Sequence, residues 1–214
     1  MIERLLIKTE LNDSRVNYAQ FLKHNPGSKT LVVIFPGGDN STDIPTLHYA
    51  RKTTLVLGCD VLSLHYGAWH QSAGSSDEEA YKLQLEECYH AISQASPFSY
   101  EKVFFISKSI GNSIALDLDD HHFNSKINHV FYTPISKFID RISQKNCLVL
   151  TGSKDHLICK EDIESLMAHK HVEVHQFADA VHSLEINDNV DQSLTILREA
   201  TDLCRKYIEK QIKY

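Results

Sequence analysis

Short, continuous apolar runs that alternate with helical patterns constrain the fold of this chain more than any other feature. The runs cover residues 5–9, 30–35, 60–64, 102–107, 128–133, 147–151 and 172–177. Several are apolar at consecutive positions rather than at every second position, which is typical of parallel strands buried on both faces. The alternation of such runs with helical segments predicts an α/β fold, with a mostly parallel central sheet covered by helices on both faces.

Two segments show clear helical periodicity. In residues 77–95, five apolar side chains follow the four-three spacing of one helix face: Tyr81, Leu85, Cys88, Ile92 and Ala95. Ser76 and Glu79 have the spacing of a capping box at the start of this helix. The last helix begins near Val190, and we expect its buried side to carry Leu194, Leu197, Cys204 and Ile208.

Length and composition favour a single domain over residues 1–214. Hydrophobic residues make up 42% of the chain, which is normal for a globular protein, and no repeat or Pro/Gly/Ser-rich linker divides it. The longest uninterrupted apolar run, 31–35, is far shorter than the roughly 18 residues of a membrane span. Charged residues interrupt the apolar residues at the amino terminus, so we expect no secretory signal there.

Charge and cysteine content argue against further classes. The chain has 22 basic and 28 acidic residues, a formal net charge of -6, and no basic block that would bind the phosphate backbone of a nucleic acid. Its five cysteines lie at least 12 positions apart, which matches neither a disulfide framework nor a zinc-binding motif. We therefore expect a protein of the reducing cytoplasm.

A strand-to-helix turn around Ser109 is the first candidate site. Residues 103–113 pass directly from an apolar strand into a helical pattern, which would raise the hydroxyl of Ser109 above the strand ends. Such a turn needs small residues two positions before and after the serine, and Ser107 and Gly111 occupy these positions. Taken alone, the pattern is weak, because a serine-rich helix cap is the more common explanation of it.

Acidic and histidine side chains follow two later strands. Asp155 comes after the strand at 147–151, and His182 comes after the strand at 172–177. Because the carboxyl ends of parallel strands meet at one edge of the sheet, both should lie near Ser109. Serine, acid, histidine is the chain order of a catalytic triad on such a sheet. Asp179 is the rival acid, to which we assign a turn-forming role.

A glycine pair after the strand at 30–35 adds a fourth element. Gly37 and Gly38 would let the backbone turn so that an N–H group points at a substrate oxygen. Taken singly, these glycines indicate no more than a turn after a strand. Four such elements, in this order and at one edge of a sheet, favour a catalytic site.

These elements together resemble the α/β-hydrolase family, over the chain from about Thr30 to the last helix. They resemble in particular its small bacterial members with a serine nucleophile and no large cap domain. The resemblance implies Ser109 as nucleophile, Asp155 as acid and His182 as base.

The resemblance also implies an oxyanion hole formed by the backbone N–H groups of Gly38 and Ile110. Two positions depart from the family pattern. Pro36 stands where a histidine often precedes this glycine pair, and Ser107 stands in place of the first glycine of the turn.

Three further side chains are candidates for substrate binding. Tyr66 and Trp69 follow the strand at 60–64 and would form a wall at the active edge, although ordinary loop packing explains them equally well. Lys108 precedes the nucleophile and would favour an acidic substrate, but a solvated lysine is the commoner case. The serine-rich segment 72–76 suggests a small lid. Only a short stretch separates Thr133 from the helical pattern near Ser136, so we expect no large cap.

A cluster of possible metal ligands occurs at residues 119–122, with the sequence Asp-Asp-His-His. It follows the helix after Ser109, away from the expected active edge, and it lacks further ligands at suitable spacing. We interpret it as a solvated loop rather than a metal site.

The residues thus predict a serine hydrolase that cleaves small carboxylic esters and needs no metal or organic cofactor. Its partner would be a small-molecule acyl ester, with neither nucleic acid nor membrane involved. A thioesterase or an acyltransferase would use the same three side chains. A non-catalytic binding protein on the same fold is the contrasting class, since fold alone does not fix function.

Overall fold

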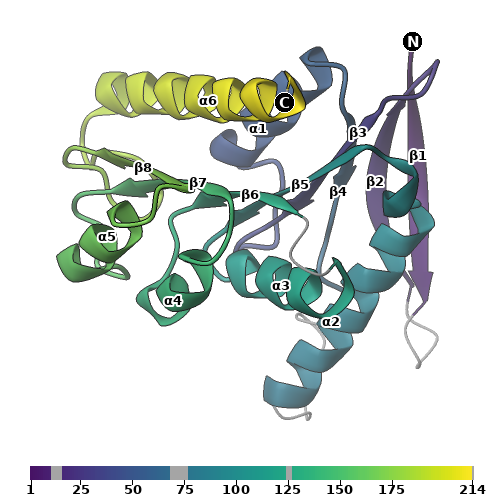
Figure 1. The fold of residues 1–214 in the computed structure, drawn as a ribbon, viewed down its shortest axis with the longest axis horizontal. Coiled ribbons are helices and arrows are strands. Elements are labelled where there is room, and N and C mark those ends of the chain that lie inside the picture. Colours follow the sequence, from purple (N-terminus) through teal and green to yellow (C-terminus); the bar gives the residue numbers. More distant parts are fainter. Residues whose placement is uncertain (11–15, 68–76, 124–126, 214) are drawn as a thin grey trace.

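The computed structural model describes residues 1–10, 16–67, 77–123 and 127–213. These residues form a sheet of eight strands in the order β1-β2-β4-β3-β5-β6-β7-β8, with helices on both faces (Figure 1). The strands are β1 (Ile2–Glu10), β2 (Val16–His24), β3 (Thr30–Phe35), β4 (Asp60–Ser63), β5 (Lys102–Lys108), β6 (Asn128–Tyr132), β7 (Cys147–Gly152) and β8 (Val172–Phe177).

The sheet is mostly parallel, as the apolar runs predicted. Strands β4, β3, β5, β6, β7 and β8 pair in parallel, whereas β2 is antiparallel to both β1 and β4. Every residue of β3 and of β7 is buried. Their continuous apolar character follows from this burial, because both faces of these central strands are covered.

Helices divide between the two faces of the sheet. Figure 1 shows α1 (Pro45–Val56) and α6 (Val190–Lys213) on one face, and α2 (Asp77–Gln94), α3 (Gly111–Leu118), α4 (Ile139–Ile142) and α5 (Lys160–Met167) on the other. Alternate residues of one strand enter opposite cores. On β5, Ile106 packs in the core beneath α1 and α6, and Phe105 packs in the core beneath α2 and α3.

The buried side of α6 agrees with the prediction at Cys204 and Ile208 and differs from it at Leu194 and Leu197. Leu194 is exposed and Leu197 is only half-buried, whereas the core contains Ile196, Ala200, Cys204, Tyr207 and Ile208. The helix therefore turns the i, i+4 row that begins at Ile196 toward the sheet. Leu194 and Leu197 instead face a cleft beside α1.

The first predicted helix has a shifted face as well. In α2, Ala80, Cys88, Ala91 and Ile92 are buried, and Tyr81 and Leu85 pack at the margin of the core. Ser76 of the predicted capping box lies outside the described residues. Within the described parts of the chain, no helix has both the length and the apolar character that a membrane crossing requires.

Candidate active site

Ser109 occupies a tight turn between β5 and α3. Its φ angle is 53°, in the left-handed region that few residues other than glycine adopt. The turn is held by hydrogen bonds, as Ser109 N donates to Tyr132 O at 3.0 Å and Asn112 N donates to Ser109 O at 3.0 Å. A strained serine at the junction of a strand and a helix is the geometry of a nucleophile elbow.

Gly111 is required by the close approach of the loop after β3. A methyl group built on Gly111 would lie 2.3 Å from the carbonyl oxygen of Pro36 and 3.1 Å from that of Phe35. Neither backbone oxygen can move aside without displacing the loop. The absent side chain therefore lets the two loops meet at the carboxyl edge of the sheet.

Ser107 fits the position at which the family pattern has glycine. Its side chain is buried, and its hydroxyl donates to Oδ1 of Asn112 at 2.7 Å. Because this bond satisfies the hydroxyl, a serine is accommodated without an unpaired polar group in the core. Asn112 was not singled out from the sequence, although its place in the first turn of the helix after the elbow is a signal for such a role.

His182 joins the elbow to an acidic side chain from a third loop. Its Nε2 lies 2.8 Å from Ser109 Oγ, and its Nδ1 lies 2.8 Å from Asp155 Oδ2. The other carboxylate oxygen of Asp155 accepts a hydrogen bond from the N–H of Leu157 at 2.9 Å. Three side chains far apart in the sequence are thus connected in one chain of hydrogen bonds.

The electrostatic surroundings keep Asp155 ionised. Burial alone would raise the pKa of this carboxyl, but the hydrogen bonds from His182 and from the N–H of Leu157 lower its pKa below the usual value. An ionised Asp155 accepts a hydrogen bond from the Nδ1–H group of His182. Nε2 is then left as the acceptor that faces the Ser109 hydroxyl.

Asp179, the rival acid, points elsewhere. Its carboxylate forms an exposed ion pair with Lys154 at 2.8 Å. Its backbone has a positive φ of 60°, and its N–H donates to Ser153 Oγ at 2.8 Å. These features are those of a turn residue.

Gly38 and Ile110 lie next to each other above the elbow. A methyl group built on Gly38 would be 4.0 Å from Cγ2 of Ile110. Among the turn and loop hydrogen bonds between backbone groups of the described residues, neither the Gly38 N–H nor the Ile110 N–H is a donor. Gly38 and Ile110 are the two residues to which the resemblance to the α/β-hydrolase family assigns the N–H donors of an oxyanion hole.

The candidate wall residues have different positions from those expected. Tyr66 is buried, and its hydroxyl donates to the carbonyl oxygen of Pro36 at 2.8 Å. It supports the loop after β3 from below and does not form an open wall, because the core covers its ring. The side-chain amide of Asn40 holds the backbone of Tyr66, because its Nδ2 donates to Tyr66 O and its Oδ1 accepts from Tyr66 N. Sequence reasoning missed this role. Trp69 and the segment 72–76 lie outside the described residues.

Lys108 is buried, so its interpretation as a solvated lysine was wrong. Its Nζ donates to the carbonyl oxygen of His182 at 3.4 Å. Burial lowers the pKa of this ammonium group, and the nearby charges of Asp39, Asp155 and Glu185 oppose that change. The side chain is directed to the α1 and α6 side of the sheet because β5 alternates its side chains between the two faces.

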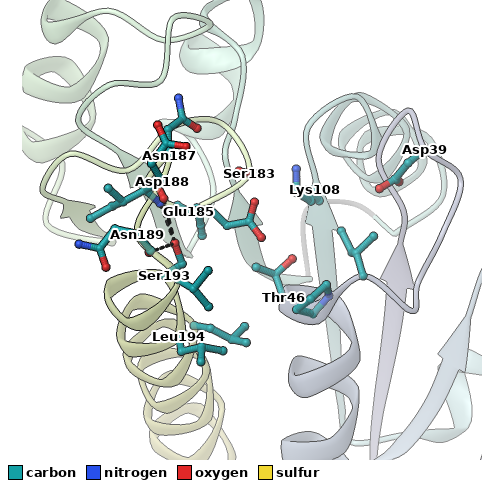
Figure 2. Close-up of a pocket in the computed structure, with 16 residues that line it drawn as sticks. Asp39, Thr46, Lys108, Ser183, Glu185, Asn187, Asp188, Asn189, Ser193 and Leu194 are labelled. Atoms are coloured by element: carbon teal, nitrogen blue, oxygen red, sulfur yellow. Dashed lines mark hydrogen bonds between the residues drawn. The ribbon is translucent and has the colours of Figure 1, made fainter.

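A cleft opens beside these residues, between the amino ends of α1 and α6. It has a volume of about 670 Å³, within the range of small-molecule sites. Figure 2 shows Lys108 between the Asp39 loop and the loop that carries Glu185, with Leu194 farther along α6. The sequence did not predict this cleft, because it forms between segments that are distant along the chain.

The acidic and histidine cluster at 119–122 is not a solvated loop throughout. Asp119 is completely buried, and its Oδ2 contacts His129 Nε2 at 3.0 Å and Lys145 Nζ at 2.8 Å. The expected loop is a helical turn, Asp119–Phe123, that continues α3. Among the described residues, no group of three or more His, Cys, Asp or Glu side chains has the arrangement of a metal site.

We compared the chain with protein-family models, with curated proteins and with solved structures. The sequence matches no protein-family model and no curated protein. Its structure is similar to that of the esterase Pf2001 from Pyrococcus furiosus, with a TM-score of 0.72, 13% identity, and coverage of 98% of this chain and 91% of that chain. It is also similar to a serine hydrolase without a lid from Xanthomonas campestris, with a TM-score of 0.70, 12% identity, and coverage of 98% and 95%.

A third similar structure is a serine hydrolase homologue from Coxiella burnetii, with a TM-score of 0.65, 14% identity, and coverage of 95% of this chain and 96% of that chain. The protein therefore has the α/β-hydrolase fold.

Between β6 and β7 the chain contains only a single 3₁₀ turn, Ser136–Phe138, and the four-residue helix α4. No cap domain is inserted at this place, as the sequence predicted.

Proposed function

We propose that this protein is a serine hydrolase that cleaves small carboxylic esters through an acyl-enzyme on Ser109. The observation that carries the proposal is the pair of 2.8 Å contacts that His182 makes with Ser109 and Asp155. The fold supports it as well, since the solved structures with the same architecture include an esterase.

The first chemical step is attack by Ser109 on the ester carbonyl carbon. His182 accepts the hydroxyl proton at Nε2 during this attack and then gives it to the leaving alcohol. Asp155 holds the imidazole in the required tautomer and stabilises its protonated form. The negative oxygen of the tetrahedral intermediate accepts hydrogen bonds from the N–H groups of Gly38 and Ile110, each worth about 3 kcal/mol.

The second step releases the acid. Water attacks the acyl-enzyme carbonyl while His182 removes a proton from the water, and the proton then returns to Ser109 Oγ as the carboxylic acid leaves. All proton transfers in both steps pass through one nitrogen atom, Nε2. That atom lies in hydrogen-bond contact with Ser109 Oγ before any substrate binds.

A fluorophosphonate reagent tests the proposal directly. We expect one covalent adduct on Ser109, located by mass spectrometry of proteolytic fragments, and hydrolysis of p-nitrophenyl acetate by the unlabelled protein. Ser109→Ala should lose both the adduct and the hydrolysis. Ser113→Ala is the matched control, because Ser113 is a serine of the adjoining helix whose hydroxyl donates to the backbone oxygen of Ile110.

Absence of labelling in the folded protein would overturn the proposal. A non-catalytic binding protein on the hydrolase fold would then be the better interpretation. Circular dichroism of the same sample distinguishes this result from simple unfolding.

A further inference from the structure

The cleft between α1 and α6 starts at the proposed catalytic residues. Its inner end is lined by Lys108 and Ser183, which are the chain neighbours of Ser109 and His182. Asp39, the next residue after Gly38, lies across the opening (Figure 2). A molecule whose ester group sits at Ser109 therefore has this cleft directly beside it.

The walls of the cleft are largely apolar. They include Ile44 and Pro45 on the α1 side, and Ile186, Val190, Leu194 and Leu197 on the α6 side. A second hollow of about 280 Å³ continues from it, shares Leu194 and Leu197, and extends to Tyr49 and Thr201. The α6 wall from Val190 to Thr201 spans roughly 16 Å at about 1.5 Å per residue, which is the length of an extended alkyl chain of roughly twelve carbon atoms at about 1.25 Å per carbon–carbon bond.

Several of these wall residues expose large apolar side chains to water. Val190 is 73% exposed, Leu194 is 58% exposed and Tyr49 is 49% exposed. Single exposed apolar residues are common, but a group of them next to a polar catalytic centre is typical of a surface that an apolar ligand covers.

Charges at the cleft select against anionic ligands. Asp39, Glu185 and Asp188 line it, and none of the three forms an ion pair within the described residues. Lys108 is the single basic side chain that lines the cleft, and Arg198 lines the second hollow, so the three carboxylates still outnumber the basic side chains. A carboxylate or a phosphate-rich thioester such as an acyl-coenzyme A would be repelled here, whereas a neutral ester would not.

We propose that this cleft binds the alkyl chain of an uncharged ester, and that Leu194 and Leu197 set the preferred chain length. This inference rests on the proposed hydrolase function and names its substrate class: neutral esters with an alkyl chain of up to roughly twelve carbon atoms. The chain packs along α6, while the ester group remains at Ser109. Each methylene that enters the cleft leaves water and contributes to binding in the transition state.

Two series of esters test the inference and identify which part of the substrate enters the cleft. One series is p-nitrophenyl esters with acyl chains of two to about sixteen carbons, and the other is alkyl acetates with alcohols of the same lengths. In one of them we expect kcat/KM to rise about two- to fourfold per methylene and to stop rising near about twelve carbons. Octanoyl-coenzyme A should be a poorer substrate than the neutral octanoate ester.

Leu194→Glu places a charge on the apolar wall at an exposed helical position, where folding should tolerate it. We expect the ratio of kcat/KM for the eight-carbon ester to that for the two-carbon ester to fall at least about tenfold. Met167→Glu is the matched control, since Met167 is 57% exposed and belongs to α5 on the opposite face of the sheet. That variant should keep the wild-type ratio.

The outcomes separate this inference from the proposed function. If short esters are hydrolysed but kcat/KM is independent of chain length, or Leu194→Glu keeps the ratio, the cleft inference is wrong and the hydrolase proposal stands. If no ester is hydrolysed and Ser109 is not labelled, both fail together. If light scattering shows a dimer that Leu194→Glu dissociates without a change in the ratio, the apolar wall is an interface between two copies and the inference is overturned.

Discussion

At the scale of single residues, the choice between two aspartates decides how the proposed triad works. Asp155 is buried and touches His182, whereas Asp179 is exposed and pairs with Lys154. Asp155→Asn should reduce kcat by about 10⁴, because the amide favours the wrong imidazole tautomer. Asp179→Asn should change kcat less than about threefold, since it removes only an exposed ion pair.

Steady-state kinetics on p-nitrophenyl acetate measure both effects. Thermal unfolding of the two variants should show that both remain folded. A large loss of kcat in Asp179→Asn with wild-type kcat in Asp155→Asn would reverse the assignment of the acid.

At the scale of elements, the contact between the elbow and the loop after β3 is the most demanding feature of the site. A methyl group on Gly111 would lie 2.3 Å from Pro36 O, so Gly111→Ala must displace the loop that carries Gly38. We expect a loss of about 1–3 kcal/mol in the free energy of unfolding, as for other overpacked sites. We also expect a loss of kcat of at least about tenfold, through the displaced oxyanion donor.

Gly27→Ala is the matched control for this substitution. A methyl group at Gly27 meets no atom within 4 Å, so stability and kcat should both stay close to those of the wild type. Urea unfolding and ester hydrolysis measure the two quantities. Equal stability and equal kcat in Gly111→Ala and wild type would show that the two loops do not depend on this contact.

The elements that the sequence predicted correctly are those with a clear apolar pattern along the chain. Strands such as β3 and β7 are apolar at almost every position, and the structure confirms them. Strand β2, which lies between β1 and β4 and is antiparallel to both, was missed because its exposed and buried residues mix. Helix α1 was missed because it buries polar side chains such as Arg51 and Thr54, which weakens its apolar periodicity.

The local sequence also could not predict which faces of neighbouring elements pack against each other. In α6, two apolar rows compete, one through Leu194 and one through Ile196, and only packing against the sheet and α1 decides which is buried. The chain order of Ser109, Asp155 and His182 indicated their common edge, because parallel strands end together. The burial of Lys108 and the presence of a cleft beside it depend on segments from three parts of the chain.

At the scale of the whole molecule, a buried polar cluster lies at the sheet edge opposite the proposed catalytic centre. Asp119 at the end of α3, His129 on β6 and Lys145 just before β7 are each buried, and Asp119 contacts both others. The cluster joins a helix to the amino ends of two central strands. It therefore links protonation at this remote edge to the stability of the entire fold.

Acidification should weaken the fold through His129. Burial lowers the pKa of this imidazole, a change that hydrogen bonding to Asp119 only partly offsets. At pH values between the pKa of His129 in the folded protein and about 6.5, its pKa in the unfolded chain, the unfolded chain binds a proton that the folded chain does not. The free energy of unfolding therefore falls as the pH falls through this range, by at most about 1.4 kcal/mol per pH unit. The pKa of Asp119 is also lowered, against the raising effect of burial, by contacts with His129 and Lys145. Its contribution is present above pH about 4 and is lost only below that value.

His129→Gln tests this dependence, because glutamine keeps a hydrogen-bond donor but has no proton to gain. Urea unfolding at pH 5, 6, 7 and 8 should show a smaller loss of stability on acidification in this variant than in the wild type. His169→Gln, at an exposed position before β8, is the control and should keep the wild-type dependence on pH. If the wild type and His129→Gln lose stability in parallel from pH 7 to pH 5, the buried imidazole does not couple protonation to folding.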